Sequence, residues 1–475
     1  MAQSKGVKVM RHWVPWREDS CSQCRSSRAR RVPVPDRFES FADRERAGRK
    51  LRRHLPRPEQ GLWKAKPNRA DPLDILRMIH RGRLESILPI KFGRMAASPF
   101  GFFRGAAAVM AADLATRPRT GLHVQICGDA HVKNLGAYAA PDGHLVFDIN
   151  DFDESVHGPF EWDLKRLATS IVLAGREAGD RDRDSSEAVL LFARAYREAL
   201  AEFARMTALH LFRYEIRSVP QNNPIGATLR KAERETPLRT LEKLTVPAKG
   251  GGRRFVRQPP LLEPLDPPLR RKVLAALVRY RDTISHDRQL VLAAYRPVDA
   301  AFKAVGVGSL GTRDYVVYCA GAAPKDILFL QVKEEPPSCY EPYVRRSGAV
   351  IHQGNRVARA QHRMQTISDP FLGWTTIDGR DYLVRQLADH KAAVTPEELS
   401  TRSLAEYAVV CGQLFAKAHS RTGDPAALSG YGGTSTKLDS ALRKFAFAYA
   451  DQTAADHERL LRAIRRGEIK ARRGI

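Results

Sequence analysis

The stretch from His123 to Leu167 constrains the fold of this 475-residue chain more than any other part of the sequence. It opens with an apolar run, His123 to Cys127, which predicts a short buried strand that ends in a turn at Gly128. Leu145 to Ile149 predicts a second strand of the same kind. We therefore expect this stretch to form the buried centre of a mixed α/β fold.

Acidic and amide side chains follow both predicted strands. Asp129 comes directly after the first turn, and Asn134 stands five residues later. The end of the second strand carries three carboxylates, Asp148, Asp151 and Asp153. Asp and Asn are also common turn formers, because their side chains bond the local backbone, and this simpler explanation stays open. The longer pattern is Gly-Asp-x-His-x-x-Asn, a strand, Asp-Phe-Asp and then an Asp that opens a helix. It is rarer by chance and indicates a site that places magnesium and a nucleophile.

A second signature begins at Gly306. It is G-x-G-x-x-G, formed by Gly306, Gly308 and Gly311 with Ser309 inside it. Dinucleotide-binding folds also use this pattern, but they place a helix at the third glycine. Here residues 312–318 predict another strand, which gives the hairpin of a kinase glycine-rich loop. Glycine lets the backbone approach phosphates closely, and its amides can bond their oxygens.

Lys333 ends the next predicted strand, Ile327 to Lys333. Alternate side chains of this strand share a face, so Lys333 lies on the same side as Phe329 and Gln331. Protein kinases use a lysine at such a position to bind the α- and β-phosphates of ATP. The simpler alternative is a strand-end lysine that faces solvent.

Several segments together resemble a known family. GDAHVKN, FDINDFDES and GPFEWDLKRLA are similar to the bacterial domain of unknown function 2252 family (DUF2252), as are SPFGFFRGAA, VGVGSLGTRDY, LFLQVKEE and YLVRQLADHK. That family is distantly similar to aminoglycoside phosphotransferases and protein kinases. The resemblance covers about Leu51 to Asp424. It implies a two-lobed fold with an ATP site, and it implies no known substrate.

The resemblance also implies a role for each residue of the first signature. Asp129 is the expected base that orients an acceptor hydroxyl. Asp163 is expected to brace the catalytic loop, and His131 to support it by hydrogen bonding. The implied cofactors are ATP and Mg²⁺, and the implied metal ligands are Asn134 and Asp151, with Asp148 and Asp153 as alternates for Asp151.

The nucleotide-binding residues follow from the second signature. Lys333 would bind phosphate, and Glu341 is the best match for its acidic partner among Glu334, Glu335 and Glu341. Backbone groups near Gln386 and Leu387 would bond the adenine. For Arg104, an ion pair is preferred to a phosphate contact. The full set of expected nucleotide-binding residues is Gly306, Gly308, Ser309, Gly311, Lys333, Glu341, Gln386 and Leu387.

These kinase-like parts occur in a rotated order, because the catalytic loop precedes the glycine loop. A circular permutation would reconcile this. We expect a C-lobe at 51–300 with an irregular insertion at 216–268, an N-lobe at 301–389, and hinge and helices at 390–458. The helix Ser403 to Ser420 would then pack beside His123 to Cys127. The predicted fold is thus a permuted, kinase-like α/β (α+β) fold with an N-terminal helical extension.

The net charge of +26 is concentrated at the two ends of the chain. Residues 1–70 hold 19 Lys or Arg against 7 Asp or Glu, and residues 459–475 hold 7 against 1. No recognisable nucleic-acid-binding motif accompanies this charge. We therefore expect poorly ordered basic tails at 1–50 and 459–475 that make at most weak, non-specific contacts with polyanions.

The remaining features predict a cytoplasmic protein with no membrane partner. No apolar run is long enough to span a bilayer, and the first residues lack an apolar signal core. Six cysteines in a chain of this length do not suggest a disulfide framework. Cys21 and Cys24 form one isolated CxxC, which more often is incidental than a metal or redox site.

The predicted function is transfer of a phosphoryl group from ATP to a hydroxyl acceptor, either a small molecule or a protein. Two alternatives remain. One is nucleotidyl transfer (AMPylation) on the same fold, and the other is a non-catalytic nucleotide-binding scaffold.

Overall fold

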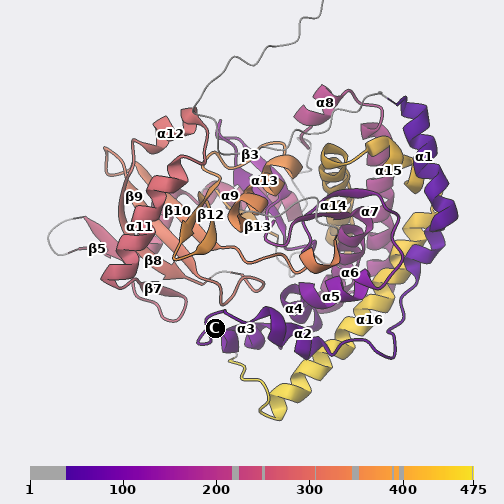
Figure 1. The fold of residues 1–475 in the computed structure, drawn as a ribbon, viewed down its shortest axis with the longest axis horizontal. Coiled ribbons are helices and arrows are strands. Elements are labelled where there is room, and N and C mark those ends of the chain that lie inside the picture. The colour runs from indigo at the N-terminus through magenta and orange to yellow at the C-terminus, as the bar shows by residue number, and fades with distance from the viewer. Residues whose placement is uncertain are drawn as a thin grey trace, which may run out of the picture. The chain divides into compact units, whose positions relative to one another are not determined.

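A six-stranded antiparallel sheet is the largest sheet of the described residues (Figure 1). The computed structural model describes residues 39–216, 224–248, 252–304, 306–344, 352–387, 390–394, 399, 401–472 and 474. Cys21 and Cys24 lie outside these ranges. The strand order is β11-β12-β10-β9-β8-β7. The strands are β7 (Leu262–Pro264), β8 (Arg296–Lys303), β9 (Asp314–Ala320), β10 (Ile327–Glu334), β11 (Gly373–Ile377) and β12 (Arg380–Gln386).

The central hairpin of this sheet has the predicted form. The glycine motif lies between β8 and β9, which pair antiparallel, and Lys333 lies near the end of β10. The predicted start of this lobe at residue 301 is wrong, however. β8 begins at Arg296, and β7 pairs with it from within the segment that we expected to be an irregular insertion.

Helices cover the sheet. α11 (Pro267–Arg281) packs on one face, where Val273 and Tyr280 share a hydrophobic core with Leu330 and Val384. On the other face α10 (Pro237–Leu244) contributes Leu241 to a second core. α13 (Gln353–Met364) contacts β11 and β12. Nearby elements are α9 (Pro224–Arg234), β5 (Thr245–Pro247), β6 (Arg253–Phe255), α12 (His286–Leu292) and η2 (Glu341–Tyr343).

The predicted catalytic stretch lies among long helices and two small sheets. β1 (His123–Ile126) pairs with β4 (Val156–Pro159), and β2 (Leu135–Ala139) lies between β3 (Leu145–Ile149) and β13 (Ala392–Ala393). The apolar faces of the helices share the largest core of the described residues with these strands. The helices are α6 (Phe160–Ala178), α7 (Asp182–Phe203), α8 (Ala208–Arg213), α14 (Thr401–Thr422), α15 (Pro425–Gly432) and α16 (Lys437–Arg465).

Helix α14 returns to the first strand, as predicted. The backbone N–H of Gln125 in β1 donates to the hydroxyl of Thr422 at 3.2 Å. Just beyond the helix, Gly423 lies so close to Val124 that a Cβ there would overlap its side chain. The mixed α/β class and this return contact are therefore confirmed.

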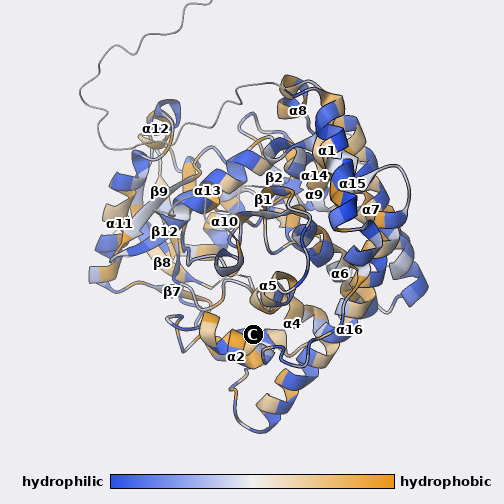
Figure 2. Cartoon of the chain, turned by 45° about the vertical axis from the view of Figure 1, so that its right-hand side comes forward, coloured by the Kyte–Doolittle hydropathy of each residue, from blue (hydrophilic) through white to orange (hydrophobic). Residues whose placement is uncertain are grey.

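From residue 39 on, where the description begins, five α-helices precede the predicted catalytic stretch. They are α1 (Phe41–His54), α2 (Pro72–Ile79), α3 (Leu88–Met95), α4 (Pro99–Gly105) and α5 (Ala107–Ala115), with the short η1 (Arg57–Gly61) after α1. α1 is predominantly hydrophilic (Figure 2), yet it packs closely on α15. Gly48 and Gly430 make this approach possible, since a Cβ on either would overlap the backbone of the other helix. The expected tail through residue 50 is thus wrong for Phe41–Lys50.

The basic C-terminal segment is also ordered where it is described. α16 runs to Arg465, and Leu460, Ala463 and Ile469 are buried. The N–H of Arg472 donates to the carbonyl of Pro89 at 2.7 Å. The expectation of a solvated tail at 459–475 is therefore wrong for residues 459–472. Across the described ranges, every helix is too short or too polar for a transmembrane span.

Candidate active site

The turn before Asp129 is fixed by glycine and by Asp163. Gly128 has a φ of +82°, and a Cβ there would overlap the carbonyl of Glu154. Asp163 lies in the first turn of α6 and is fully buried. Its carboxylate accepts the backbone N–H groups of Cys127 at 2.9 Å and Gly128 at 3.0 Å. The predicted bracing role of Asp163 is confirmed.

One carboxylate oxygen of Asp129 is held by hydrogen bonds, and the other is directed into the site. Arg166, one turn after Asp163 in α6, donates from Nε to Oδ1 of Asp129 at 2.8 Å and bonds the same oxygen with a second nitrogen. The Oδ2 atom lies 3.7 Å from Nε2 of His131. A Cβ on Gly308 of the glycine loop would lie 3.8 Å from it. The glycine loop and the predicted base therefore face each other.

His131 has the supporting role that was expected. Its Nδ1 accepts the backbone N–H of Lys133 at 3.2 Å, so the side chain fixes the loop conformation. The ring is buried, and this burial together with the charges of Arg104 and Arg166 holds its pKa well below the usual value. His131 is consequently neutral near pH 7.

Two carboxylates and an amide form the candidate metal ligands. The Nδ2 of Asn134 donates to the carbonyl of Asp129 at 2.7 Å, which leaves its Oδ1 as the atom able to bind a cation. Burial, and then the charge of Asp153, raise the pKa of Asp151 to about 7. Burial also acts on Asp153, but the ammonium of Lys333 outweighs it and lowers the pKa of Asp153 to about 2.

This donor set fits magnesium. Among the described residues, no three His, Cys, Asp or Glu side chains converge into a complete metal centre. Magnesium, however, keeps several waters and takes few protein ligands beside its substrate phosphates. Asn134, Asp151 and Asp153 supply oxygen donors of the kind it prefers.

Asp148 lies apart from these donors. It forms an ion pair with Lys417 of α14, and both side chains are almost fully buried. Its Oδ1 also accepts the backbone N–H of Ile149 at 2.8 Å. Asp148 therefore joins α14 to β3, and we do not retain it as an alternate metal ligand.

Lys333 meets the first signature directly. Its side chain is only 4% exposed and pairs with Asp153, 180 residues earlier in the chain. Burial alone would lower the pKa of Lys333, but Asp153 and Asp151 raise it. The alternative of a solvent-facing lysine is therefore wrong.

Glu335 is a further acidic neighbour of Lys333. It follows two residues later, so both side chains lie on one face of the chain. A charge on Glu335 would raise the pKa of Lys333, but burial holds the pKa of Glu335 itself well above its usual value. Its carboxylate is buried, and neither oxygen has a hydrogen-bond partner among the described residues. Glu334 instead pairs with Arg313 and Arg380. Glu341 begins η2, and its pairing with Lys333 stays a prediction.

The glycine loop is held by basic side chains of the N-terminal helices. The carbonyl of Gly308 accepts from Nζ of Lys91 at 2.5 Å and from Arg83 at 2.9 Å. Arg94 donates to the carbonyl of Gly306 at 2.9 Å. Gly306 and Gly311 have φ values of +68° and +92°, which only glycine adopts readily. Ser309 closes the turn by accepting from the N–H of Thr312 at 3.0 Å.

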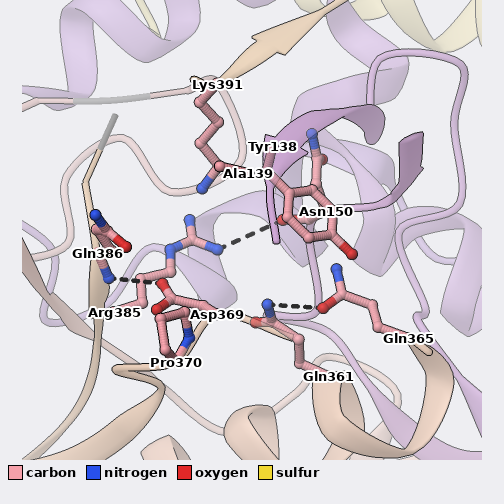
Figure 3. Close-up of a pocket in the computed structure, with 10 residues that line it drawn as sticks. All are labelled: Tyr138, Ala139, Asn150, Gln361, Gln365, Asp369, Pro370, Arg385, Gln386 and Lys391. Atoms are coloured by element: carbon pink, nitrogen blue, oxygen red, sulfur yellow. Dashed lines mark hydrogen bonds between the residues drawn. The ribbon is translucent and has the colours of Figure 1, made fainter. Parts of the chain in front are cut away.

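The predicted hinge borders a small cavity (Figure 3). The N–H of Gln386 donates to Asp369 at 2.6 Å, and the N–H of Leu387 donates to the carbonyl of Phe329 at 2.8 Å. Both amides are thus engaged, and residues 388 and 389 lie outside the described ranges. The cavity measures about 30 Å³, room for about one or two waters. Its lining includes Asn150, Asp369, Arg385, Gln386 and Lys391.

Sequence reasoning missed several residues of this site. Arg166 had a detectable signal, because it lies three residues after Asp163 and so shares its helix face. Lys91 and Lys417 had none, since their partners lie far away in the sequence. Glu335 was among the three candidate partners of Lys333, but Glu341 was preferred to it.

The family comparison gives one match. A family model described as an uncharacterised protein conserved in bacteria, DUF2252, matches residues 83–463. No curated protein and no solved structure matches the chain. The matched range includes both signatures and the basic residues that hold the glycine loop.

Proposed function

This chain belongs to the bacterial DUF2252 family, and we propose that it is an ATP-dependent phosphotransferase with a circularly permuted, kinase-like fold. The glycine loop, Lys333 and strand β12 supply the N-lobe elements. The loop after β1 and the carboxylates after β3 supply the catalytic elements. The contact of α14 with β1 supports the permuted order.

One observation carries the proposal. The Lys333–Asp153 ion pair and the approach of Gly308 to Asp129 join two segments that are some 180 residues apart in sequence. A lysine, a glycine loop, an Asp base and an Asn-Asp metal set within one cluster are the parts that phosphoryl transfer requires.

Each side chain then has a defined task. Oδ2 of Asp129 accepts the acceptor hydroxyl proton, while Arg166 holds Oδ1 and so fixes the carboxylate. Lys333 exchanges Asp153 for the α- and β-phosphates, and Asp151 nearby favours the charged ammonium. Mg²⁺, held by Asn134, Asp151 and Asp153, would neutralise charge on the phosphate oxygens.

Nucleotide binding and transfer by the full-length chain test this proposal. Mg²⁺ with the non-hydrolysable analogue AMP-PNP, at one hundred times its dissociation constant, should stabilise the protein by about 2.7 kcal/mol. D129N should bind AMP-PNP but transfer phosphate at least about 100-fold more slowly. K333M should lose both properties. K325M, in the exposed turn between β9 and β10, should lose neither.

The position of the transferred label separates the alternatives. Label from the γ-phosphate on the acceptor supports phosphotransfer, whereas label from the α-phosphate would replace it by nucleotidyl transfer. Binding without any transfer, unchanged by D129N, would replace it by a scaffold. Absence of AMP-PNP binding would refute all nucleotide-based proposals.

A further inference from the structure

Three basic side chains from the N-terminal helices reach the candidate active site. Arg83 follows α2, Lys91 lies in α3 and Arg104 lies in α4. Most of the carboxylates that act on them electrostatically belong to the site. They are Glu154, Asp153 and Glu334 for Arg83, Glu154 and Asp129 for Lys91, and Asp129, Glu177 and Asp151 for Arg104. The cluster therefore lies on the Asp129 side of the site.

Lys91 is a buried amine bonded to a neutral oxygen, and burial holds its pKa well below the usual value. The residue is 1% exposed, and its Nζ donates to the carbonyl of Gly308 at 2.5 Å. An ammonium in such a position is costly unless it is paired with an anion. A phosphate or carboxylate oxygen would be a stronger partner than this carbonyl.

Arg104 carries an unsatisfied donor, and its backbone lies near the same glycine. Its Nε is buried and has no hydrogen-bond partner among the described residues. The carbonyl of Arg104 and Oδ2 of Asp129 are equally distant, 3.8 Å, from a Cβ on Gly308. Among the described residues, Nε of Arg104 therefore takes no part in the ion pair that was expected for this side chain.

The nucleotide does not account for these charges in the proposed arrangement. Lys333, the glycine amides and the metal ligands serve its phosphates, and Arg166 is occupied by Asp129. Lys91 and Arg104 instead come from the N-terminal helices α3 and α4. These helices lie on the side of Asp129, whose Oδ2 atom would receive the acceptor proton. A second anion next to Asp129 explains both the costly ammonium and the unsatisfied guanidinium.

We propose that the acceptor is an anionic hydroxyl compound whose phosphate or carboxylate group binds Lys91 and Arg104 beside Asp129. The inference rests on the proposed phosphotransfer. The acceptor oxygen bonds to the γ-phosphorus as the bond from that phosphorus to the ADP oxygen breaks, and the hydroxyl proton passes to Asp129. The products are ADP and a phosphoester that carries two anionic groups.

Binding of inorganic phosphate to the full-length protein, measured with saturating Mg²⁺ and AMP-PNP, tests the site. Because the nucleotide site is then filled, phosphate should report the acceptor site. R104M should weaken phosphate binding at least tenfold and change AMP-PNP affinity less than twofold. K91M also releases the glycine loop, so it should weaken the binding of both ligands. R104K should keep most of the phosphate affinity. R402M, which removes a 91% exposed charge, is the control and should change neither affinity.

Matched acceptors provide a second, chemical readout. ADP formation should be at least tenfold faster with glycerol 3-phosphate than with glycerol, or with ribose 5-phosphate than with ribose. The inference is overturned if no phosphate binds beside AMP-PNP, or if R104M weakens AMP-PNP binding as much as phosphate binding. Equal rates with neutral and anionic acceptors would also overturn it. Failure of AMP-PNP to bind would instead refute the proposed function itself.

Thermal unfolding of each variant controls for misfolding. K91M and R104M remove charges from different helices, and Arg104 is the less buried of the two, so R104M is the decisive variant if K91M does not fold. A folded R104M protein with unchanged phosphate affinity would overturn the inference.

Discussion

Asp148 and Asp153 stand five residues apart, and a lysine from a distant part of the chain neutralises each of them. The Lys417–Asp148 pair is at most 2% exposed on either side, whereas the Asp153 side chain of the other pair is 21% exposed. A fully enclosed pair cannot exchange partners without unfolding its surroundings. The first pair is therefore structural, and the second can respond to a ligand.

Removing Lys417 should destabilise the protein strongly. K417M leaves the carboxylate of Asp148 buried without its cation, which typically costs about 3–5 kcal/mol. The free energy of unfolding in urea should fall by that amount. R402M breaks the exposed Arg402–Glu406 pair and should cost less than about 1 kcal/mol. A K417M loss as small as that of R402M would contradict the structural role.

Asp314 should make stability depend on pH. Burial raises its pKa from 3.8 to about 7, although Lys333 and a 2.7 Å hydrogen bond from Gln331 oppose this. Between pH 4 and 7 the folded chain keeps a proton here that the unfolded chain releases. Its stabilising contribution is therefore complete below pH 4 and is lost as pH rises to 7, at up to about 1.4 kcal/mol per pH unit.

D314N should remove this dependence. The difference in unfolding free energy between D314N and the wild type should change in favour of D314N from pH 4.5 to 7 and then stay constant. Urea midpoints at four pH values measure it. A difference that does not vary with pH would show that Asp314 is ionised throughout.

At the scale of the element, the chain relies on close approaches as much as on apolar faces. α14 and α7 pack so closely that a Cβ on Gly412 would overlap the backbone of Phe192. α1 and α15 cross in the same way at Gly48 and Gly430. Glycine thus fixes two helix pairs, each of which includes one of the C-terminal helices α14 and α15.

Substitution of Gly412 should separate α14 from α7. G412A places a methyl group into a contact already filled by backbone, and such overpacking costs about 1–3 kcal/mol. Urea unfolding should record this loss. G432A is the matched control, because the nearest atom to its Cβ is 3.7 Å away, and it should change stability much less. Equal effects of the two would refute close packing as the cause.

Local sequence patterns predicted many of the helices and strands. They failed where an element is buried without a regular pattern of apolar side chains. Alternation identified β10 with Lys333, and helical spacing identified α14 and α6. α1 was missed because its closest contact is made by Gly48, in an otherwise polar sequence. β7 was missed because three residues beside several prolines give no alternation. The Lys91–Gly308 and Lys417–Asp148 contacts join distant segments, so no local signal records them.

At the scale of the whole molecule, the C-terminal segment supports the N-terminal helices. Ile469 is buried in the core that also holds Leu73 and Val307. Gly93 of α3 lies so close to Arg472 that a Cβ there would overlap its backbone. The two ends of the described fold are thus joined beside the helix that carries Lys91.

Deletion of residues 466–475 should loosen these helices. The loss of buried Ile469 alone should cost about 2–5 kcal/mol, and the bond from Arg472 to Pro89 is lost as well. Hydrogen exchange should accelerate in residues 72–105. K470A, at an exposed position in the same segment, is the control and should leave exchange unchanged. Unchanged exchange after deletion would contradict this support.

The order in which the paired segments occur along the chain has a consequence for its synthesis. The loop with Asp129 and Asp153 leaves the ribosome long before Lys333, and Lys417 of α14 comes later still. Translation from residue 153 to the end of α14 at 422 takes roughly 13 to 54 seconds at about 5–20 residues per second. During that interval the nascent chain carries acidic groups whose lysine partners do not yet exist. A chain interrupted before α14 would therefore be a substrate for chaperones or proteases rather than a partly active protein.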